Sequence, residues 1–173
     1  MLLAFPYHNN YVELIRMELN ALASVKPAGN NLNQFAIIGS GPLPLTSLCI
    51  LDHLNKQDQF VTCHNIDQNP EAISSSNNVC RALGHTKKAI CFQCSNAKDT
   101  NLDLSGFDVV YLAALVGACG ERKRDILASV VQRMRPGAFI LLRSARKSST
   151  QSVAFMSLPL PSLIHDKMSG RDG

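Results

Sequence analysis

The sequence predicts an α/β fold in which a mostly parallel sheet is covered by helices. Short runs of apolar residues alternate with longer segments of helical periodicity along most of the chain. The first of these runs ends in the turn Gly39-Ser40-Gly41, and a segment that can be helical follows. This alternation is typical of parallel sheets with right-handed crossovers. With 173 residues, 46% of them hydrophobic and 17% charged, the chain is long enough for one domain with a buried core.

Residues 1–30 are expected to form an aromatic segment followed by a helix. The segment FPYHNNY at residues 5–11 is rich in aromatic and turn-forming residues. After it, apolar residues recur at positions 12, 14, 15, 19 and 22, which places them on one face of an amphipathic helix over residues 12–22. Asn10 is a suitable N-cap for this helix. A loop that contains Pro27 and Gly29 follows its end.

Residues 31–147 are expected to form the sheet and its crossover helices. Pro70 and Gly84 delimit one helix, because proline suits the first helical turn and glycine the position after the last. The run at 107–114 is continuous enough in apolar residues for a central strand. The predicted strands are 35–38, 60–67, 89–94, 107–114 and 138–143, and the predicted crossover helices are 43–54, 71–83 and 121–134.

Residues 148–173 are expected to form an irregular, disordered tail. This part of the chain has a stretch rich in serine and threonine, followed by a segment that Pro159 and Pro161 interrupt. Neither of these two segments has the period of a helix or that of a strand, and chain termini are commonly poorly ordered.

The composition argues against several classes of protein and partner. No apolar run approaches the length that spans a membrane, and the first residues do not resemble a signal peptide. We therefore expect a soluble, cytoplasmic protein. Much of the net charge of +4 comes from basic residues between positions 122 and 147. Because no aromatic residues are interleaved with them, a solvated surface is favoured over a nucleic-acid site.

Six cysteines are scattered through the predicted strands and helices, without the loop-rich texture of a disulfide scaffold. We expect reduced and mostly buried thiols. Cys91 and Cys94 have the C-x-x-C spacing, but positions i and i+3 of a strand face opposite sides. No metal site is therefore predicted.

The turn after the first strand predicts a small-molecule site. Glycines there let the backbone approach a ligand closely, and a helix follows in the position that binds nucleotides in open α/β sheets. The third glycine of the dinucleotide fingerprint is missing, and Pro42 and Pro44 remove two N–H donors from the turn. A pyrophosphate would be bound poorly, so a ligand with ribose and adenine but no phosphate fits better. S-adenosylmethionine is the expected ligand.

Three further residues are candidates for this site. Asp67 ends the second predicted strand, where an acid can accept hydrogen bonds from a ribose diol, although a turn or cap role is the alternative. Asn96 follows the third strand and can read adenine, and a plain turn asparagine is about equally compatible with its position. Tyr111 lies in the fourth strand and is expected in the core, with a place in the pocket as the alternative.

Several long motifs together resemble the nicotianamine synthase family. They are FPYHNNY at 5–11, FAIIGSGPLPLTS at 35–47, HNIDQNP at 64–70, VVYLAALVG at 109–117 and PGAFILLRSA at 136–145. The resemblance spans roughly residues 5–146. It implies a Rossmann-like, S-adenosylmethionine-dependent methyltransferase-like domain. The implied activity condenses three S-adenosylmethionine molecules to nicotianamine, a metal chelator, and releases three methylthioadenosines.

The resemblance also assigns roles to individual residues. The turn over residues 39–46 would hold the methionyl end of S-adenosylmethionine, and the segment 112–117 would close the adenosine pocket. Tyr7 would be the catalytic aromatic residue, and His8 occupies the place of a second tyrosine of the family. The implied ligand contacts, together with Asp67 and Asn96, come from Gly39, Ser40, Gly41, Pro42, Leu43, Thr46, Ala113 and Leu115.

The resemblance further implies that this chain is shortened at both ends. Family members have a helical N-terminal domain before the aromatic segment, and their sheet continues past the motif that ends at residue 145. We therefore expect a sheet that is incomplete at its C-terminal side. Two alternatives to nicotianamine synthase remain: a catalytically inactive S-adenosylmethionine-binding module and a small-molecule methyltransferase.

Overall fold

The computed structural model describes residues 8–85, 89–113, 120–144 and 152–157. Its centre is a six-stranded sheet in the order β3-β2-β1-β4-β5-β6. The first five strands are parallel, as the sequence predicts, and β6 runs antiparallel to β5. The strands are β1 (Gln34–Ile38), β2 (Thr62–Asp67), β3 (Ile90–Cys94), β4 (Val109–Leu112), β5 (Phe139–Ser144) and β6 (Ser152–Ser157).

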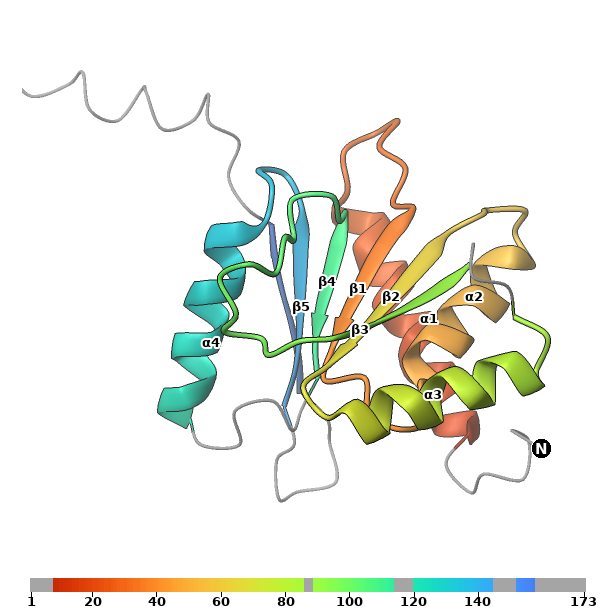
Figure 1. Cartoon of the computed structure of the whole chain (residues 1–173). Helices are drawn as coiled ribbons and strands as arrows, with labels where there is room; N and C mark the ends of the chain where they lie inside the picture. The colour runs from red at the N-terminus through yellow and green to blue at the C-terminus, as the bar shows by residue number, and fades with distance from the viewer. Residues whose placement is uncertain (1–7, 86–88, 114–119, 145–151, 158–173) are drawn as a thin grey trace, which may run out of the picture.

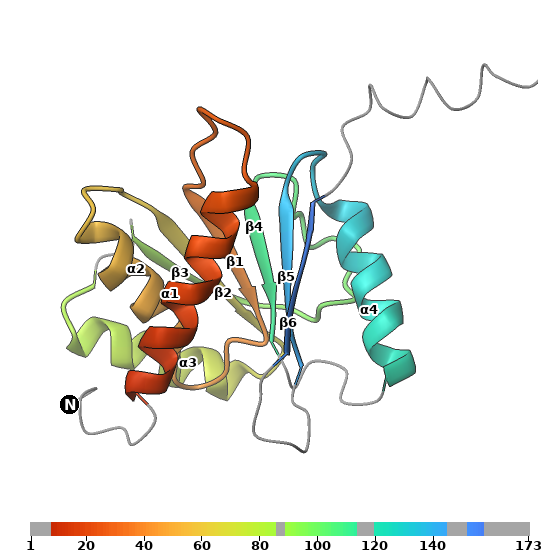
Figure 2. The same ribbon diagram turned by 180° about the vertical axis from the view of Figure 1, so that it is seen from behind.

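Helices cover both faces of the sheet, which gives three layers (Figure 1). On one face, α1 (His8–Val25), α2 (Leu45–Asn55) and α3 (Pro70–Ala82) pack over a core that includes Phe35. On the other face, α4 (Gly120–Arg133) packs over a second core that includes Val110. In Figure 2, the view from behind, α1 lies in front of the sheet, on the face opposite to the one that α4 covers. The architecture confirms the Rossmann-like prediction.

Helix α1 is longer than predicted and belongs to the main core. It begins at His8, so Asn10 lies inside the helix and the prediction that Asn10 is its cap was wrong. The helix buries Ile15, Leu19 and Leu22 in the same cluster as the residues of β1 and β4. Packing of this apolar face stabilises helical turns that local propensity alone would not. The helix expected within residues 1–30 therefore belongs to the same domain as residues 31–147.

The connection from β3 to β4 contains an irregular segment in place of a crossover helix. Leu102 and Leu104 of this segment fill the core beneath α4, and Leu104 forms an isolated bridge with Met134. The guanidinium of Arg133 donates hydrogen bonds to the backbone carbonyls of Ala97 and Asp99 and to that of Leu102 at 3.2 Å. A single arginine therefore satisfies carbonyls that a helix would have paired internally.

The expectation of an irregular tail over 148–173 was wrong for residues 152–157. They form β6, which pairs with β5 along its whole length, from Phe139 opposite Ser157 to Ser144 opposite Ser152. The backbone of β5 presents unpaired donors and acceptors on its outer side, and a neighbouring strand satisfies them whatever its side-chain pattern. The sequence does carry a signal for this strand, the run of four apolar residues at 153–156, which lies between the two segments from which the tail was predicted.

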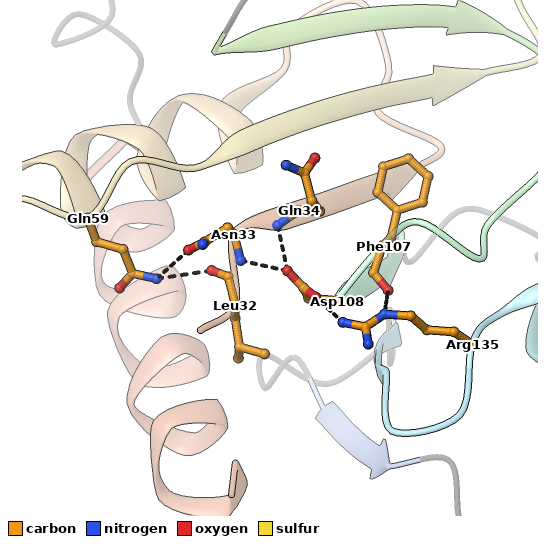
Figure 3. A network of polar contacts seen from close by, with 7 residues as sticks. All are labelled: Leu32, Asn33, Gln34, Gln59, Phe107, Asp108 and Arg135. Carbon is orange, nitrogen blue, oxygen red and sulfur yellow. Dashed lines mark hydrogen bonds and ion pairs between the residues drawn. The ribbon is translucent and has the colours of Figure 1, made fainter. Parts of the chain in front are cut away.

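A polar network closes the sheet at the edge where the parallel strands begin (Figure 3). Asp108, which precedes β4, is 8% exposed. Its carboxylate accepts hydrogen bonds from the backbone N–H groups of Asn33 at 2.7 Å and Gln34 at 2.8 Å. It also forms an ion pair with Arg135, which follows α4. This network joins the starts of β1 and β4 and lies at the edge opposite to the candidate site described below.

Candidate functional site

A pocket opens at the edge of the sheet where the parallel strands end. Its volume is about 290 Å³, near the lower end of the range for small-molecule sites. In open α/β sheets, ligands bind outside the carboxyl ends of the strands, where the strand order changes direction. This pocket has that position. It lies at the end of β1, which has β2 and β3 on one side and β4 on the other, so the strand order reverses there. The lining residues are Ile38, Gly39, Gly41, Ile66, Asp67, Gln68, Ser95, Asn96, Ala97 and Ile126.

The turn after β1 requires its two glycines. Gly39 and Gly41 have φ angles of 79° and 69°, which residues with a Cβ rarely adopt. The N–H of Gly39 donates to the carbonyl of Ile66 at 2.8 Å, so the turn leans toward the end of β2. No described atom lies within 4 Å of the position that a Cβ on Gly41 would take. The left-handed backbone conformation, and not a steric contact, is therefore what requires glycine at residue 41.

Asp67 connects the glycine turn to the start of α3. One carboxylate oxygen accepts a hydrogen bond from the N–H of Gly41 at 2.9 Å, and the other accepts from the N–H of Asn69 at 2.9 Å. The second contact is the turn role that the sequence left open, while the cap of α3 is Asn69 itself. A carboxylate has about four acceptor positions, so Asp67 can still accept hydrogen bonds from a diol.

Asn96 and Gln68 form a polar contact at the rim of the pocket. The side-chain amide of Asn96 donates to the side-chain oxygen of Gln68 at 2.9 Å. The oxygen of Asn96 accepts from the N–H of Lys98 at 2.9 Å, which is also the turn geometry expected of an asparagine. The two amide side chains come from the loops after β2 and β3, and both line the pocket.

Four of the predicted ligand contacts line the pocket together: Gly39, Gly41, Asp67 and Asn96. Ser40, Pro42, Leu43, Thr46 and Ala113 are not among the lining residues. The hydroxyl of Thr46 instead accepts a hydrogen bond from Arg143 at 2.7 Å, on the face of the sheet covered by α1. Tyr7 and Leu115 lie outside the described residues. Tyr111 is 1% exposed and belongs to the core beneath α1 and α2, as expected.

Sequence reasoning missed Gln68 and Ile126. Gln68 directly follows Asp67 at the end of a predicted strand, and this adjacency is a signal that could have identified it. Ile126 lies on the apolar face of α4, which the sequence predicts to be buried. Only the packing of α4 over the end of the sheet turns that core position into part of the pocket wall.

The described residues contain no group of three or more His, Cys, Asp or Glu side chains that could hold a metal ion. In the same part of the chain, no helix is both long enough and apolar enough to cross a membrane. The described cysteines form no disulfide bonds; Cys49, Cys63 and Cys80 are buried and Cys94 is exposed. Burial raises the pKa of Cys49 and that of Cys80 to about 11, so both are thiols at neutral pH.

Solved structures share this fold. A glutamate-to-glutamine mutant of MtNAS in complex with S-adenosylmethionine aligns with a TM-score of 0.65 at 20% identity, over 90% of this chain and 65% of that one. MtNAS in complex with MTA and tNA aligns with a TM-score of 0.61 at 24% identity, over 81% and 46%. The CurJ carbon methyltransferase aligns with a TM-score of 0.60 at 20% identity, over 80% and 35%. The fold is therefore that of the S-adenosylmethionine-dependent methyltransferase-like proteins.

Sequence comparison is more specific than the fold. Nicotianamine synthase 3 from Arabidopsis thaliana is 38% identical over 146 residues, which are 82% of this chain and 43% of that protein. Nicotianamine synthase 3 from Oryza sativa subsp. indica is 36% identical over 141 residues, with coverages of 82% and 40%. The chain thus spans less than half the length of these relatives. The family model described as "Nicotianamine synthase protein" matches residues 1–156, and this chain belongs to the nicotianamine synthase family.

Proposed function

We propose that this chain binds S-adenosylmethionine in the pocket at the end of the sheet and forms part of a nicotianamine synthase. The observation that carries the proposal is the meeting of Asp67 with the glycine turn at that pocket. An acid beside a turn that lacks phosphate-binding donors suits a ribose attached to an uncharged or cationic group. Relatives named nicotianamine synthase and a similar fold in complex with S-adenosylmethionine support the same ligand.

Further polar groups near the turn suit the proposed ligand. Gln68 and Asn96 present amide groups at the rim, where an adenine offers both a donor and acceptors. The hydroxyl of Ser40 is buried and has no hydrogen-bond partner among the described residues. A buried polar group without a partner costs free energy, and a polar group of the ligand would recover it. We infer that the turn holds the methionyl part of the molecule and that Asp67 holds the ribose.

The proposed reaction is a transfer of aminobutyrate groups between S-adenosylmethionine molecules. An α-amine nitrogen attacks the carbon beside the sulfonium, a C–N bond forms and the C–S bond breaks. The sulfur leaves as neutral methylthioadenosine, and the amine loses a proton. Orientation of the two reactants and a deprotonated amine are what the enzyme must supply. Two such transfers join three aminobutyrate units, and an attack of an amine of the same molecule on the last sulfonium-bearing chain closes a ring and releases the third methylthioadenosine. The product would be nicotianamine, so a role in metal homeostasis belongs to the same proposal.

We also infer a cytoplasmic location. The five cysteines in the described part of the chain form no disulfide bonds, and reducing compartments keep thiols in this state.

The proposal is tested with the purified chain and S-adenosylmethionine. Titration calorimetry measures binding, and mass spectrometry of the incubated mixture identifies the released nucleoside. We expect binding, and methylthioadenosine as the released product. Release of S-adenosylhomocysteine would instead identify a methyltransferase. Binding without any product would leave a binding module, and no binding at any temperature at which the chain is folded would overturn the ligand assignment.

A further inference from the structure

A charged cluster is buried beside the glycine turn, outside the pocket. Glu18 of α1 is 2% exposed, Arg143 of β5 is 6% exposed, and Thr46 is the second residue of α2. Glu18 and Arg143 are 125 positions apart in the chain, and neither lines the pocket. Charged residues are seldom this deeply buried unless they are paired, so the cluster needs an explanation.

The guanidinium of Arg143 connects three elements. Its Nε and Nη2 donate to the two carboxylate oxygens of Glu18 at 2.9 and 2.7 Å, which is the bidentate geometry that only arginine offers. Its Nη1 donates to the hydroxyl of Thr46 at 2.7 Å. The rings of Tyr11 and Tyr111 lie with their centres 5.9 and 5.3 Å from the guanidinium carbon, within cation–π range.

Arg143 is held in its charged form. Burial alone lowers the pKa of Arg143, but the hydrogen bonds and the negative charge of Glu18 outweigh burial, so the pKa is raised. Buried ion pairs of this kind are often no more stabilising than apolar side chains of similar volume, although the loss of one partner is costly. Stability is therefore a weak reason for a pair that apolar residues could replace. A directional role fits the geometry better, because hydrogen bonds set the relative orientation of elements that apolar contacts would leave free to slide.

The cluster and the pocket meet at the same turn. On the pocket side, the N–H groups of Gly39 and Gly41 are held by Ile66 and Asp67 at the end of β2. On the other side, Arg143 holds Thr46, where the turn has passed into α2. Arg143 is also the penultimate residue of β5, at the same edge of the sheet as the pocket. The turn is thus fastened at both ends, to β2 and to the pair formed by β5 and α1.

We propose that Glu18, Arg143 and Thr46 are positioning residues that hold the glycine turn in its ligand-binding conformation and in register with α1. The inference rests on the proposed S-adenosylmethionine site for its functional consequence, while its structural consequence is independent of any ligand. Tyr7, the predicted catalytic residue, directly precedes α1 in the sequence. If the cluster fixes the position of α1 relative to the glycine turn, it also fixes the position of the first residues of α1 relative to the bound S-adenosylmethionine.

Two variants separate positioning from stability. Arg143→Lys keeps the positive charge but loses the bidentate fork and the reach to Thr46. The double variant Glu18→Leu with Arg143→Met replaces the ion pair by apolar groups of similar size and is expected to keep most of the unfolding temperature. Asp108→Asn is the control, because the buried carboxylate of Asp108 forms an ion pair with the partly exposed Arg135 at the opposite edge of the sheet (Figure 3).

The first measurement is amide hydrogen exchange of the peptide over residues 39–46 in the ligand-free chain. We expect faster exchange in both cluster variants and an unchanged rate in Asp108→Asn. The second measurement is the S-adenosylmethionine dissociation constant by calorimetry, which we expect to rise about twofold to a hundredfold in the cluster variants, the range of coupling between contacting groups. The control should bind like the original chain at a temperature where it is folded.

The results distinguish this inference from the proposed function. If the original chain does not bind S-adenosylmethionine, the proposed function fails, and the exchange rates still decide whether the cluster holds the turn. If the original chain binds S-adenosylmethionine, and the folded cluster variants have the same affinity and the same exchange rates as the original chain, the positioning role is overturned. Equal changes in the cluster variants and in Asp108→Asn would also overturn it, because they would indicate a general loss of stability.

Discussion

At the scale of single residues, a conservative change at Asp67 is expected to weaken ligand binding. Its two oxygens already hold the N–H groups of Gly41 and Asn69, and the proposed ribose would add charge-assisted hydrogen bonds to the same carboxylate. Asp67→Asn keeps the size of the side chain but removes the charge and one acceptor oxygen. We expect the affinity for S-adenosylmethionine to weaken by about 1–3 kcal/mol, measured by calorimetry.

A matched control for this change is Asp103→Asn. Asp103 also accepts a hydrogen bond from the N–H two residues later, that of Ser105 at 2.8 Å, but it does not line the pocket. The control should bind S-adenosylmethionine like the original chain. An unchanged affinity in Asp67→Asn would show that Asp67 serves only the turn and not the ligand.

How far single residues could be predicted depends on how local their signal is. Gly39, Gly41 and Asp67 follow predicted strands directly, and parallel strands end at the same edge of a sheet, so their meeting could be foreseen. The contact between Glu18 and Arg143 could not, because nothing in either neighbourhood distinguishes them from surface residues of an amphipathic helix and a strand end. The contact of Thr46 with Arg143 could not be foreseen either, and the sequence led us to expect a ligand contact for Thr46.

At the scale of elements, helix α3 offers a direct test of capping. The side chain of Asn69 accepts hydrogen bonds from the N–H groups of Glu71 at 2.9 Å and Ala72 at 3.4 Å. Asn69→Ala removes both while leaving Pro70 in the first turn. We expect the free energy of unfolding to fall by about 0.5–2 kcal/mol, measured by urea denaturation.

The control for the cap is Asn78→Ala, an exposed position within the same helix. There the change should leave stability equal or slightly higher, because alanine has the higher helix propensity. If both variants lose the same stability, the cap of α3 does not contribute as the geometry indicates.

Helix ends and edge strands were harder to predict than buried strands. The helix α1 extends beyond the apolar spacing from which it was predicted, because the core packs along it and Tyr11 near its start lies against Arg143. Strand β6 contains a run of four apolar residues, 153–156, but so short a run does not by itself distinguish a strand from other buried segments, and pairing with β5 decides it. For α1 the deciding partner is distant in sequence, whereas β6 pairs with the strand that directly precedes it in the chain.

At the scale of the whole molecule, the two layers of helices determine which thiols react. Cys94 is exposed at the end of β3, while Cys49 and Cys80 lie on the buried faces of α2 and α3 with pKa values of about 11, raised mainly by burial. At pH 8 a thiol of this pKa has roughly 0.1% thiolate, since each pH unit below the pKa reduces the thiolate tenfold. Only the thiolate reacts with disulfide reagents.

We therefore expect an aromatic disulfide reagent to label Cys94 before Cys49 and Cys80 in the folded chain at pH 8. Mass spectrometry of peptides identifies each site, and the same reaction in urea should label Cys49 and Cys80 rapidly as well. Labelling of Cys49 or Cys80 at the rate of Cys94 in the folded chain would show that the helices do not cover the sheet as described.

The sequence by itself determined the α/β class, the five parallel strands, the glycine turn and the family. These features follow from short-range patterns: apolar runs set the strands, and glycine, proline and aspartate set the turns at their ends. The tertiary structure alone decided the irregular link beneath α4, the pocket wall at Ile126 and the buried cluster around Arg143. Each of these depends on groups that are far apart in the chain and that meet only when the sheet and its helices have packed, because hydrogen bonds and burial act over a few ångströms in space and not along the sequence.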